Sequence, residues 1–224
     1  MKTARAGGLQ GLEDQRKLHP NDPQILFALA DKYSAKGDTA QVIELCKKVV
    51  LYDVNDSLKL AEQAAFYLAE QNSHSGDLQP LEKFTTDYPA EINITSAHML
   101  LSHLYLEKGD GMNAERHFSV VAASHPNDDE SFNSYAWECS QKKINLESAA
   151  NYIDKAIALA KDSSTRASYM DTKAFVLYDQ NKLQESIELE KQALKLLAND
   201  QSTARLRGDL KKNLAMFEKE LAQK

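Results

Sequence analysis

The sequence predicts an all-α protein built from repeated pairs of helices, and three observations support this prediction. Apolar residues recur at the i, i+3, i+4 spacing that marks one face of a helix. Gly-Asp dipeptides interrupt these stretches, and the tetrapeptide His-Pro-Asn-Asp occurs at residues 19–22 and again at 125–128. The composition agrees: of 224 residues, 42% are hydrophobic, 27% are charged and only 8 are glycine, which suits a helical globular chain.

The clearest repeat covers residues 95–128 and reads as a complete helix–turn–helix unit. Each half carries three apolar or small residues on one helical face. These residues are Leu101, Ser102 and Tyr105 in the first half and Ala114, Phe118 and Val121 in the second. Gly109 can adopt the left-handed backbone that ends the first helix, and Pro126 stops the second. Two short antiparallel helices are therefore expected.

With this stretch as a template, the same pattern predicts five repeats within residues 23–200. They cover about residues 23–56, 57–90, 95–128, 129–161 and 167–197. The second repeat is irregular, because Tyr88-Pro89 closes its second helix after barely two turns. In the last repeat Asn181 replaces the turn glycine, and Asn tolerates the same left-handed backbone.

The two ends of the chain are predicted to cover the array. Residues 1–22 are interpreted as a partial repeat or cap, with Leu9, Leu12 and Leu18 on the inner side of a single helix. Residues 201–224 place an apolar stripe among charged residues, which predicts a C-terminal capping helix that shields the last apolar face. The missing helix partner at the N-terminal end favours one of two interpretations: a chain cut from something longer, or a first dozen residues that are an added tail and a fraying cap.

This pattern resembles the tetratricopeptide repeat (TPR), whose period is about 34 residues. The resemblance rests on the small residues Ser102 and Ala114 and their counterparts in the other repeats, together with the Gly-Asp turns. It covers nearly the whole chain. The resemblance implies a right-handed superhelical solenoid whose first helices line a concave groove that binds peptides or partner proteins.

The same resemblance implies which side chains face the groove, and we expect the partner-binding residues among them. They are Phe27, Asp31, Phe66, Glu70, Met99, His103, Leu106, Trp137, Phe175 and Tyr178. Aromatic anchors dominate interface energies and Met adapts to varied partners, so a peptide with apolar or aromatic anchors is expected. Asp31 and Glu70 favour a basic residue at one end of that peptide. The alternative is that several of these side chains pack against neighbouring repeats or the C-terminal helix.

No motif for catalysis, a cofactor or a metal is found, so the sequence predicts a non-enzymatic protein. His98 and His103 are five residues apart, more than the spacing a shared metal prefers, and His117 is expected alone on a polar flank. Cys46 and Cys139 are predicted to be small core residues. The net charge of −6 argues against nucleic acid as a partner. No apolar run approaches the ~20 residues of a membrane span, so no membrane insertion is expected.

The leading functional hypothesis is a protein-interaction scaffold that binds a peptide or protein in the groove. One alternative is the accessory region of a larger enzyme or assembly or secretion machine, for example beside a thioredoxin-like domain. A weaker alternative is self-assembly into a homo-oligomer. The sequence as given predicts a cytoplasmic protein, and a periplasmic location is the alternative if an N-terminal signal has been removed.

Overall fold

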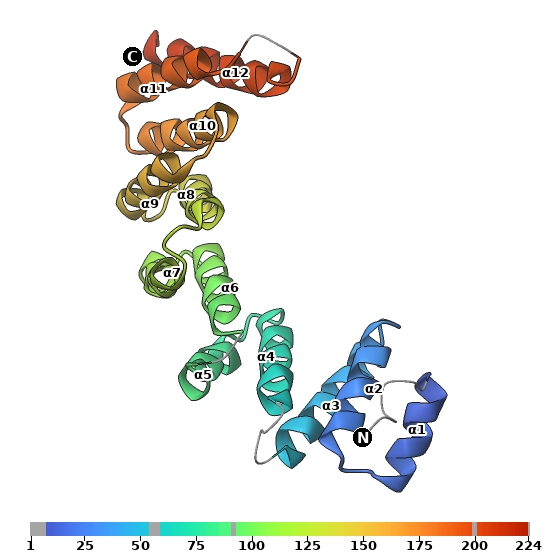
Figure 1. The fold of residues 1–224 in the computed structure, drawn as a ribbon. Coiled ribbons are helices and arrows are strands. Elements are labelled where there is room, and N and C mark those ends of the chain that lie inside the picture. The colour runs from blue at the N-terminus through green and yellow to red at the C-terminus, as the bar shows by residue number, and fades with distance from the viewer. Residues whose placement is uncertain (1–7, 54–58, 91–92, 199–200, 224) are drawn as a thin grey trace. The chain divides into compact units, whose positions relative to one another are not determined.

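The structure, a computed structural model, describes residues 8–53, 59–90, 93–198 and 201–223, and within these ranges it holds twelve helices and no strand (Figure 1). The helices are α1 (Leu9–Leu18), α2 (Pro23–Ser34), α3 (Thr39–Tyr52), α4 (Leu60–Ser73), α5 (Gln79–Asp87), α6 (Ile94–Glu107), α7 (Gly111–Ser124), α8 (Asp129–Lys142), α9 (Leu146–Leu159), α10 (Ser163–Asp179), α11 (Leu183–Leu196) and α12 (Ala204–Leu221). The all-α prediction is confirmed. No described helix combines the length and the apolar content that a bilayer crossing requires.

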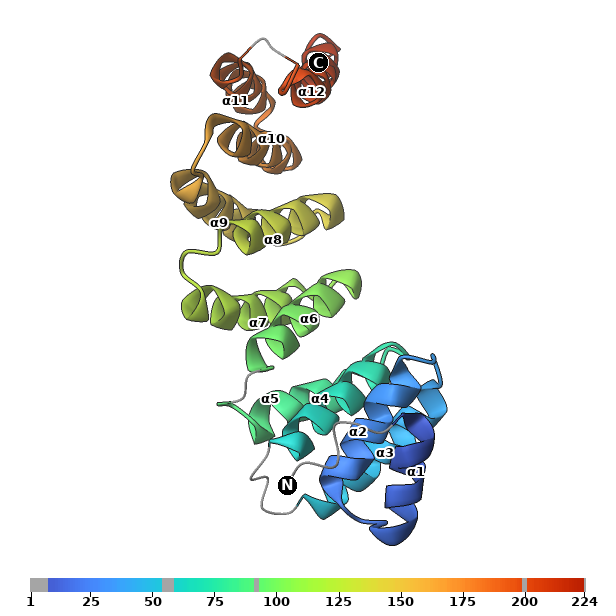
Figure 2. The ribbon, with the colours of Figure 1, turned by 45° about the vertical axis from the view of Figure 1, so that its right-hand side comes forward.

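The chain forms two compact units, residues 1–97 and residues 98–224, with the boundary inside α6. In the first unit α2 packs against α1, α3 and α4, and α4 packs against α3 and α5. In the second unit α8 pairs with α9 and α10 pairs with α11, while α10 also contacts α8, α9 and α12 (Figure 2). Each unit is thus built from neighbouring antiparallel helix pairs.

The turns between paired helices have the predicted backbone geometry. Gly109 lies at φ +78°, and Asn181, which replaces the glycine in the last repeat, lies at φ +63°. After Gly109, the carboxylate of Asp110 accepts a hydrogen bond of 3.1 Å from the backbone N–H of Asn113 and so caps the start of α7. This bond satisfies one of the backbone donors that a helix start leaves without an intrahelical partner.

The first unit departs from the expected pattern at α1 and follows it at α5. Leu12 is buried in the core, but Leu18 is 71% exposed. The prediction that Leu18 faces inward was therefore wrong. Leu18 is the last residue of α1, where the chain turns toward α2. The short second helix of the irregular repeat is observed: α5 has 9 residues and α3 has 14.

The core of the second unit is centred on aromatic rings. Phe118 is fully buried and stacks on Tyr135 at 4.1 Å between ring centroids, with the edge of Tyr152 at 4.8 Å. Cys139 is buried in the same core, and burial raises the pKa of its thiol to about 12. The prediction that Cys46 and Cys139 are core residues is confirmed, since both are buried.

The last helix covers the end of the second unit. Leu210 and Phe217 are fully buried although they belong to a helix rich in charged residues. In both views α12 lies beside α11 and α10 (Figures 1 and 2), and both helices contact it. The predicted capping helix is therefore present, and its apolar stripe is removed from water.

Gly111, the first residue of α7, lies so close to the α8–α9 turn that a larger residue is expected to destabilise the second unit. A Cβ atom there would lie 2.5 Å from Ile144 Cγ2 and closer still to the side chain of Asn145. We expect Gly111→Ala to lower the free energy of unfolding by about 1–3 kcal/mol through overpacking. Chemical denaturation of the variant measures this loss.

Gly208→Ala serves as the matched control for that substitution. Gly208 lies inside α12 with no atom within 4 Å of the added Cβ. Alanine is there expected to stabilise the helix by about 1 kcal/mol, because it loses less backbone entropy than glycine. Equal effects of the two substitutions would contradict the close approach at Gly111.

Candidate functional site

Four aromatic side chains from α8, α10 and α12 form one cluster in the second unit. Trp137 on α8 meets Phe175 on α10 edge to face, with ring centroids 5.5 Å apart. Phe217 of α12 lies 5.3 Å from Phe175 and 5.1 Å from Tyr178. We call Trp137, Phe175, Tyr178 and Phe217 the aromatic cluster. The structure thus brings together three residues predicted to bind a partner and one residue of the capping helix.

The members of this cluster differ sharply in exposure. Phe217 is fully buried, Phe175 and Tyr178 are half-buried, and Trp137 is 39% exposed. Phe175 therefore supports the indole of Trp137 from one side while packing against α12 on the other. Both interpretations of the sequence apply in part: Phe175 and Tyr178 pack against the C-terminal helix, and Trp137 keeps a large accessible surface.

Hydrogen bonds hold α10 in place around the cluster. Asn213 Nδ2 of α12 donates to Asp171 Oδ1 at 2.8 Å, and Ser140 Oγ of α8 donates to Asp179 Oδ2 at 2.6 Å. The Tyr178 hydroxyl donates to the carboxylate of Glu220, and this bond raises the pKa of Tyr178. These polar contacts therefore join α8, α10 and α12, the three helices that carry the aromatic rings.

A polar hollow of about 510 Å³ lies between α8 and α10 in the same unit. Most of its lining side chains carry hydroxyl or amide groups, and we call it the hydroxyl hollow. Its lining residues are Glu130, Asn133, Ser134, Ser164, Thr165, Ser168 and Tyr169. Within the described residues, the Oδ1 atom of Asn133 is buried and has no hydrogen-bond donor. A buried acceptor without a donor costs about 1–3 kcal/mol.

The hydroxyl hollow and the aromatic cluster share one face of α8. Asn133 and Trp137 are four residues apart, so they lie one above the other on that helix. The small hydroxyl residues of the hollow are not aromatic anchors, so the sequence prediction did not include them. The signal that could have found them is the recurrence of serine on one face of α10, at Ser164 and Ser168, in register with Phe175.

The remaining predicted residues of the second unit have different environments. His103 is exposed, and its Nδ1 atom lies 3.1 Å from Glu138 Oε2, an ion pair only when the imidazole is protonated. Met99 is half-buried against the core. Leu106 is only 1% exposed and belongs to the core with Ala114. Its assignment to the groove was therefore wrong, because the turn after α6 folds α7 back against this side chain.

The predicted residues of the first unit lie on α2 and α4. Phe27 is half-buried and packs against the local core, whereas Asp31 is exposed. Phe66 is half-buried, with its ring centroid 5.3 Å from that of Phe84 in α5. Glu70 is half-buried on the same helix. Phe27 and Phe66 thus contribute to internal packing, and Asp31 is the predicted residue of this unit that is most open to a partner.

His117 is not on a polar flank as expected. It is 2% exposed, its Nδ1 atom lies 2.8 Å from Nδ1 of His98, and its ring stacks on Tyr105. The prediction failed because His117 lies on the side of α7 that faces α6, next to Phe118 and one turn after Ala114. Among the described residues, no group of three or more His, Cys, Asp or Glu side chains is arranged to hold a metal ion.

Comparison with solved structures identifies the architecture. BtubC from P. vanneervenii superposes with a TM-score of 0.57 and 13% identity, over 83% of this chain and 86% of that one. PilW, described as a widely conserved type IV pilus biogenesis factor, gives 0.52 and 14% identity over 88% of each chain. The APC/C hetero-tetramer Cut9-Hcn1 contains a similar chain, with a TM-score of 0.50 and 15% identity. The match covers 94% of this chain and 39% of that longer one.

The solved structures similar to this chain include tetratricopeptide-repeat proteins. The chain has a TPR-like fold. At these identities the likeness concerns the fold alone. No family profile matches the sequence, and no curated protein matches it. Trp137 and Asn133 both belong to α8, the first helix of the predicted repeat at residues 129–161.

Proposed function

We propose that the chain is a non-enzymatic protein-interaction scaffold that binds a peptide segment along the shared face of α8 and α10. The observation that carries the proposal is the 39% exposure of Trp137, whose indole packs edge to face on the half-buried ring of Phe175. Trp is among the residues that most often dominate interface energies. A rigid, partly exposed indole offers a large contact area to a partner at low entropic cost.

The polar half of the same face supports a peptide as the ligand. Asn133 offers a buried acceptor, and the hydroxyl hollow offers further hydrogen bonds beside it. Side chains four residues apart on a helix are about 5–6 Å apart, close to the roughly 7 Å between alternate residues of an extended peptide. One peptide can therefore donate a main-chain N–H to Asn133 and place an apolar side chain on Trp137.

The proposal predicts that Trp137→Ala weakens peptide binding by about 30-fold or more, the effect of losing one dominant anchor. The probe is a peptide selected from a random display library on the 224-residue chain. Titration calorimetry measures its affinity for the wild type and the variant. Asn133→Ala is expected to weaken the same peptide by about tenfold, because the acceptor is lost.

Met112→Ala is the matched control, since Met112 is 84% exposed on α7, outside the aromatic cluster. The Met112→Ala variant should bind the selected peptide with the same affinity as the wild type. Circular dichroism should show unchanged helix content in all three variants. Recovery of no peptide, or equal binding by the Trp137 and Met112 variants, would count against the proposed function.

A further inference from the structure

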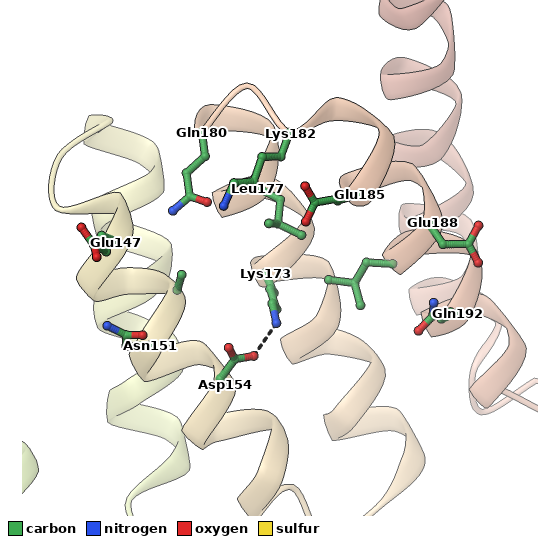
Figure 3. A pocket seen from close by; sticks show the side chains of 12 residues that line it. Glu147, Asn151, Asp154, Lys173, Leu177, Gln180, Lys182, Glu185, Glu188 and Gln192 are labelled. Atoms are coloured by element: carbon green, nitrogen blue, oxygen red, sulfur yellow. Dashed lines mark hydrogen bonds and ion pairs between the residues drawn. The ribbon is translucent and has the colours of Figure 1, made fainter.

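A second hollow in the same unit lies between α9 and α11, with α10 as its floor (Figure 3). Its volume is about 570 Å³. Glu147 of α9 stands on one wall, Glu185 and Glu188 of α11 stand on the other, and Leu177 of α10 lies between them (Figure 3). We call this hollow the furrow. Nothing in the sequence pattern marks it, because its walls come from three different helices.

The furrow and the aromatic cluster lie on opposite sides of α10. Successive residues of a helix are rotated by about 100°, so residues two apart point in nearly opposite directions. Lys173 and Leu177 line the furrow, whereas Phe175 belongs to the aromatic cluster. A ligand in the furrow would therefore not touch Trp137, and the furrow is a separate surface from the proposed peptide site.

The charges in the furrow favour a cationic ligand. Lys173 Nζ of α10 forms an ion pair of 2.5 Å with Asp154 Oδ1 of the α9 wall, and these two charges offset each other (Figure 3). Within the described part of the chain, Glu147, Glu185 and Glu188 have no ion-pair partner, and Lys182 is the one unpaired cation beside them. The two walls are therefore acidic, and their unpaired carboxylates attract basic side chains.

The furrow also contains an apolar strip and a buried acceptor. Leu177 and Leu189 come from α10 and α11, and Ala150 adds a small apolar surface from α9. Gln180 also lines the furrow, and its Oε1 atom is buried without a donor among the described residues. An occupant that matches this surface has apolar residues for the floor and N–H or ammonium donors for the walls and for Gln180.

We propose that the furrow is a second docking site, which binds an amphipathic protein segment that carries lysine or arginine beside leucine-like residues. The acidic walls set the sign of the partner's charge, and the apolar strip selects its amphipathic pattern. With the proposed peptide site on the other side of α10, the second unit presents two independent binding surfaces. The chain could then hold two partner segments at once.

The test uses the 224-residue chain and a short synthetic amphipathic peptide of leucine and lysine, with a peptide of leucine and glutamate as the counterpart. Titration calorimetry should show binding of the lysine peptide, weakening with added salt because exposed charges are screened. Glu185→Lys is expected to weaken this binding by about tenfold, since one attraction becomes a repulsion. Asp209→Lys, the same change of charge at an exposed site on α12, should leave the affinity unchanged.

Tryptophan fluorescence separates the two surfaces, because Trp137 is the only tryptophan of the chain. Binding of the lysine peptide in the furrow should leave its emission unchanged. The proposal is overturned if the lysine peptide does not bind, if the glutamate peptide binds equally well, if Glu185→Lys and Asp209→Lys have equal effects, or if the lysine peptide shifts the emission of Trp137.

Discussion

Replacement of Glu190 by glutamine is expected to stabilise the second unit by up to about 3 kcal/mol at pH 7. Glu190 on α11 is fully buried, and burial, followed by the nearby carboxyl of Asp171, raises its pKa to about 9. Neither Glu190 oxygen has a donor among the described residues. The buried side chain of Glu190, next to the carboxyl of Asp171, is therefore favoured in its protonated, neutral form. Glutamine is neutral at every pH and keeps the shape.

The sign of the pH dependence follows from the raised pKa. Below about pH 4.5 Glu190 is protonated in both the folded and the unfolded chain, so its contribution is constant. Between about pH 4.5 and 9 the folded state holds a proton that the unfolded state has lost. The free energy of unfolding therefore falls by about 1.4 kcal/mol per pH unit as the pH rises through this window. The wild type therefore loses the stability that protonated Glu190 provides as the pH rises, and the glutamine variant does not.

Urea denaturation followed by Trp137 fluorescence, at several pH values between about 5 and 8, measures the effect. The difference in unfolding free energy between variant and wild type should grow with pH. Carboxylates with lowered pKa values, such as Asp110 and Asp162, act in the opposite direction but are common to both proteins and cancel in the difference. Parallel stability curves for the two proteins would show that Glu190 is ionised in the folded state.

Phe118→Ala is expected to lower the free energy of unfolding of the second unit by about 3–5 kcal/mol, a large part of the stability of a small domain. Phe118 is fully buried between Tyr135 and Tyr152 and also meets Phe132. Truncation leaves a cavity among rings that α7, α8 and α9 contribute together. The same denaturation experiment measures the loss.

Phe118→Leu is the matched control, because leucine keeps most of the apolar volume and should cost about 1–2 kcal/mol. If Phe118→Ala cost no more than Phe118→Leu, the stacking of three helices around this ring would not be a main source of stability. Unfolding of α7 alone, with α8 to α11 still folded, would likewise contradict a shared core.

The repeat pattern predicted the helix pairs well because it reports which face of each helix is apolar. Gly109 and Asn181 were informative for the same local reason, since a left-handed residue ends a helix whatever surrounds it. Leu18 and Leu106 show the limit of this reasoning. Periodicity gives the direction of a side chain along its helix, but the neighbouring element decides whether water or protein covers it.

The candidate site was predictable only in part, for a related reason. Trp137 and Phe175 stood out because the resemblance gave them groove positions that the repeat does not need for its own packing. The hydroxyl hollow and the furrow are made of ordinary serine, glutamate and leucine side chains from two or three helices. Their function depends on which residues meet in space, as with His98 and His117, which are far apart in the sequence and adjacent in the structure.

The most direct test of the proposed function is the fluorescence of Trp137 in the wild-type chain while a display-selected peptide is added to saturation. A peptide seated on the indole removes water from it, so the emission should shift to shorter wavelength and become protected from a soluble quencher. Emission and quenching that stay unchanged while calorimetry reports saturated binding would place the peptide elsewhere and contradict a partner site on the shared face of α8 and α10.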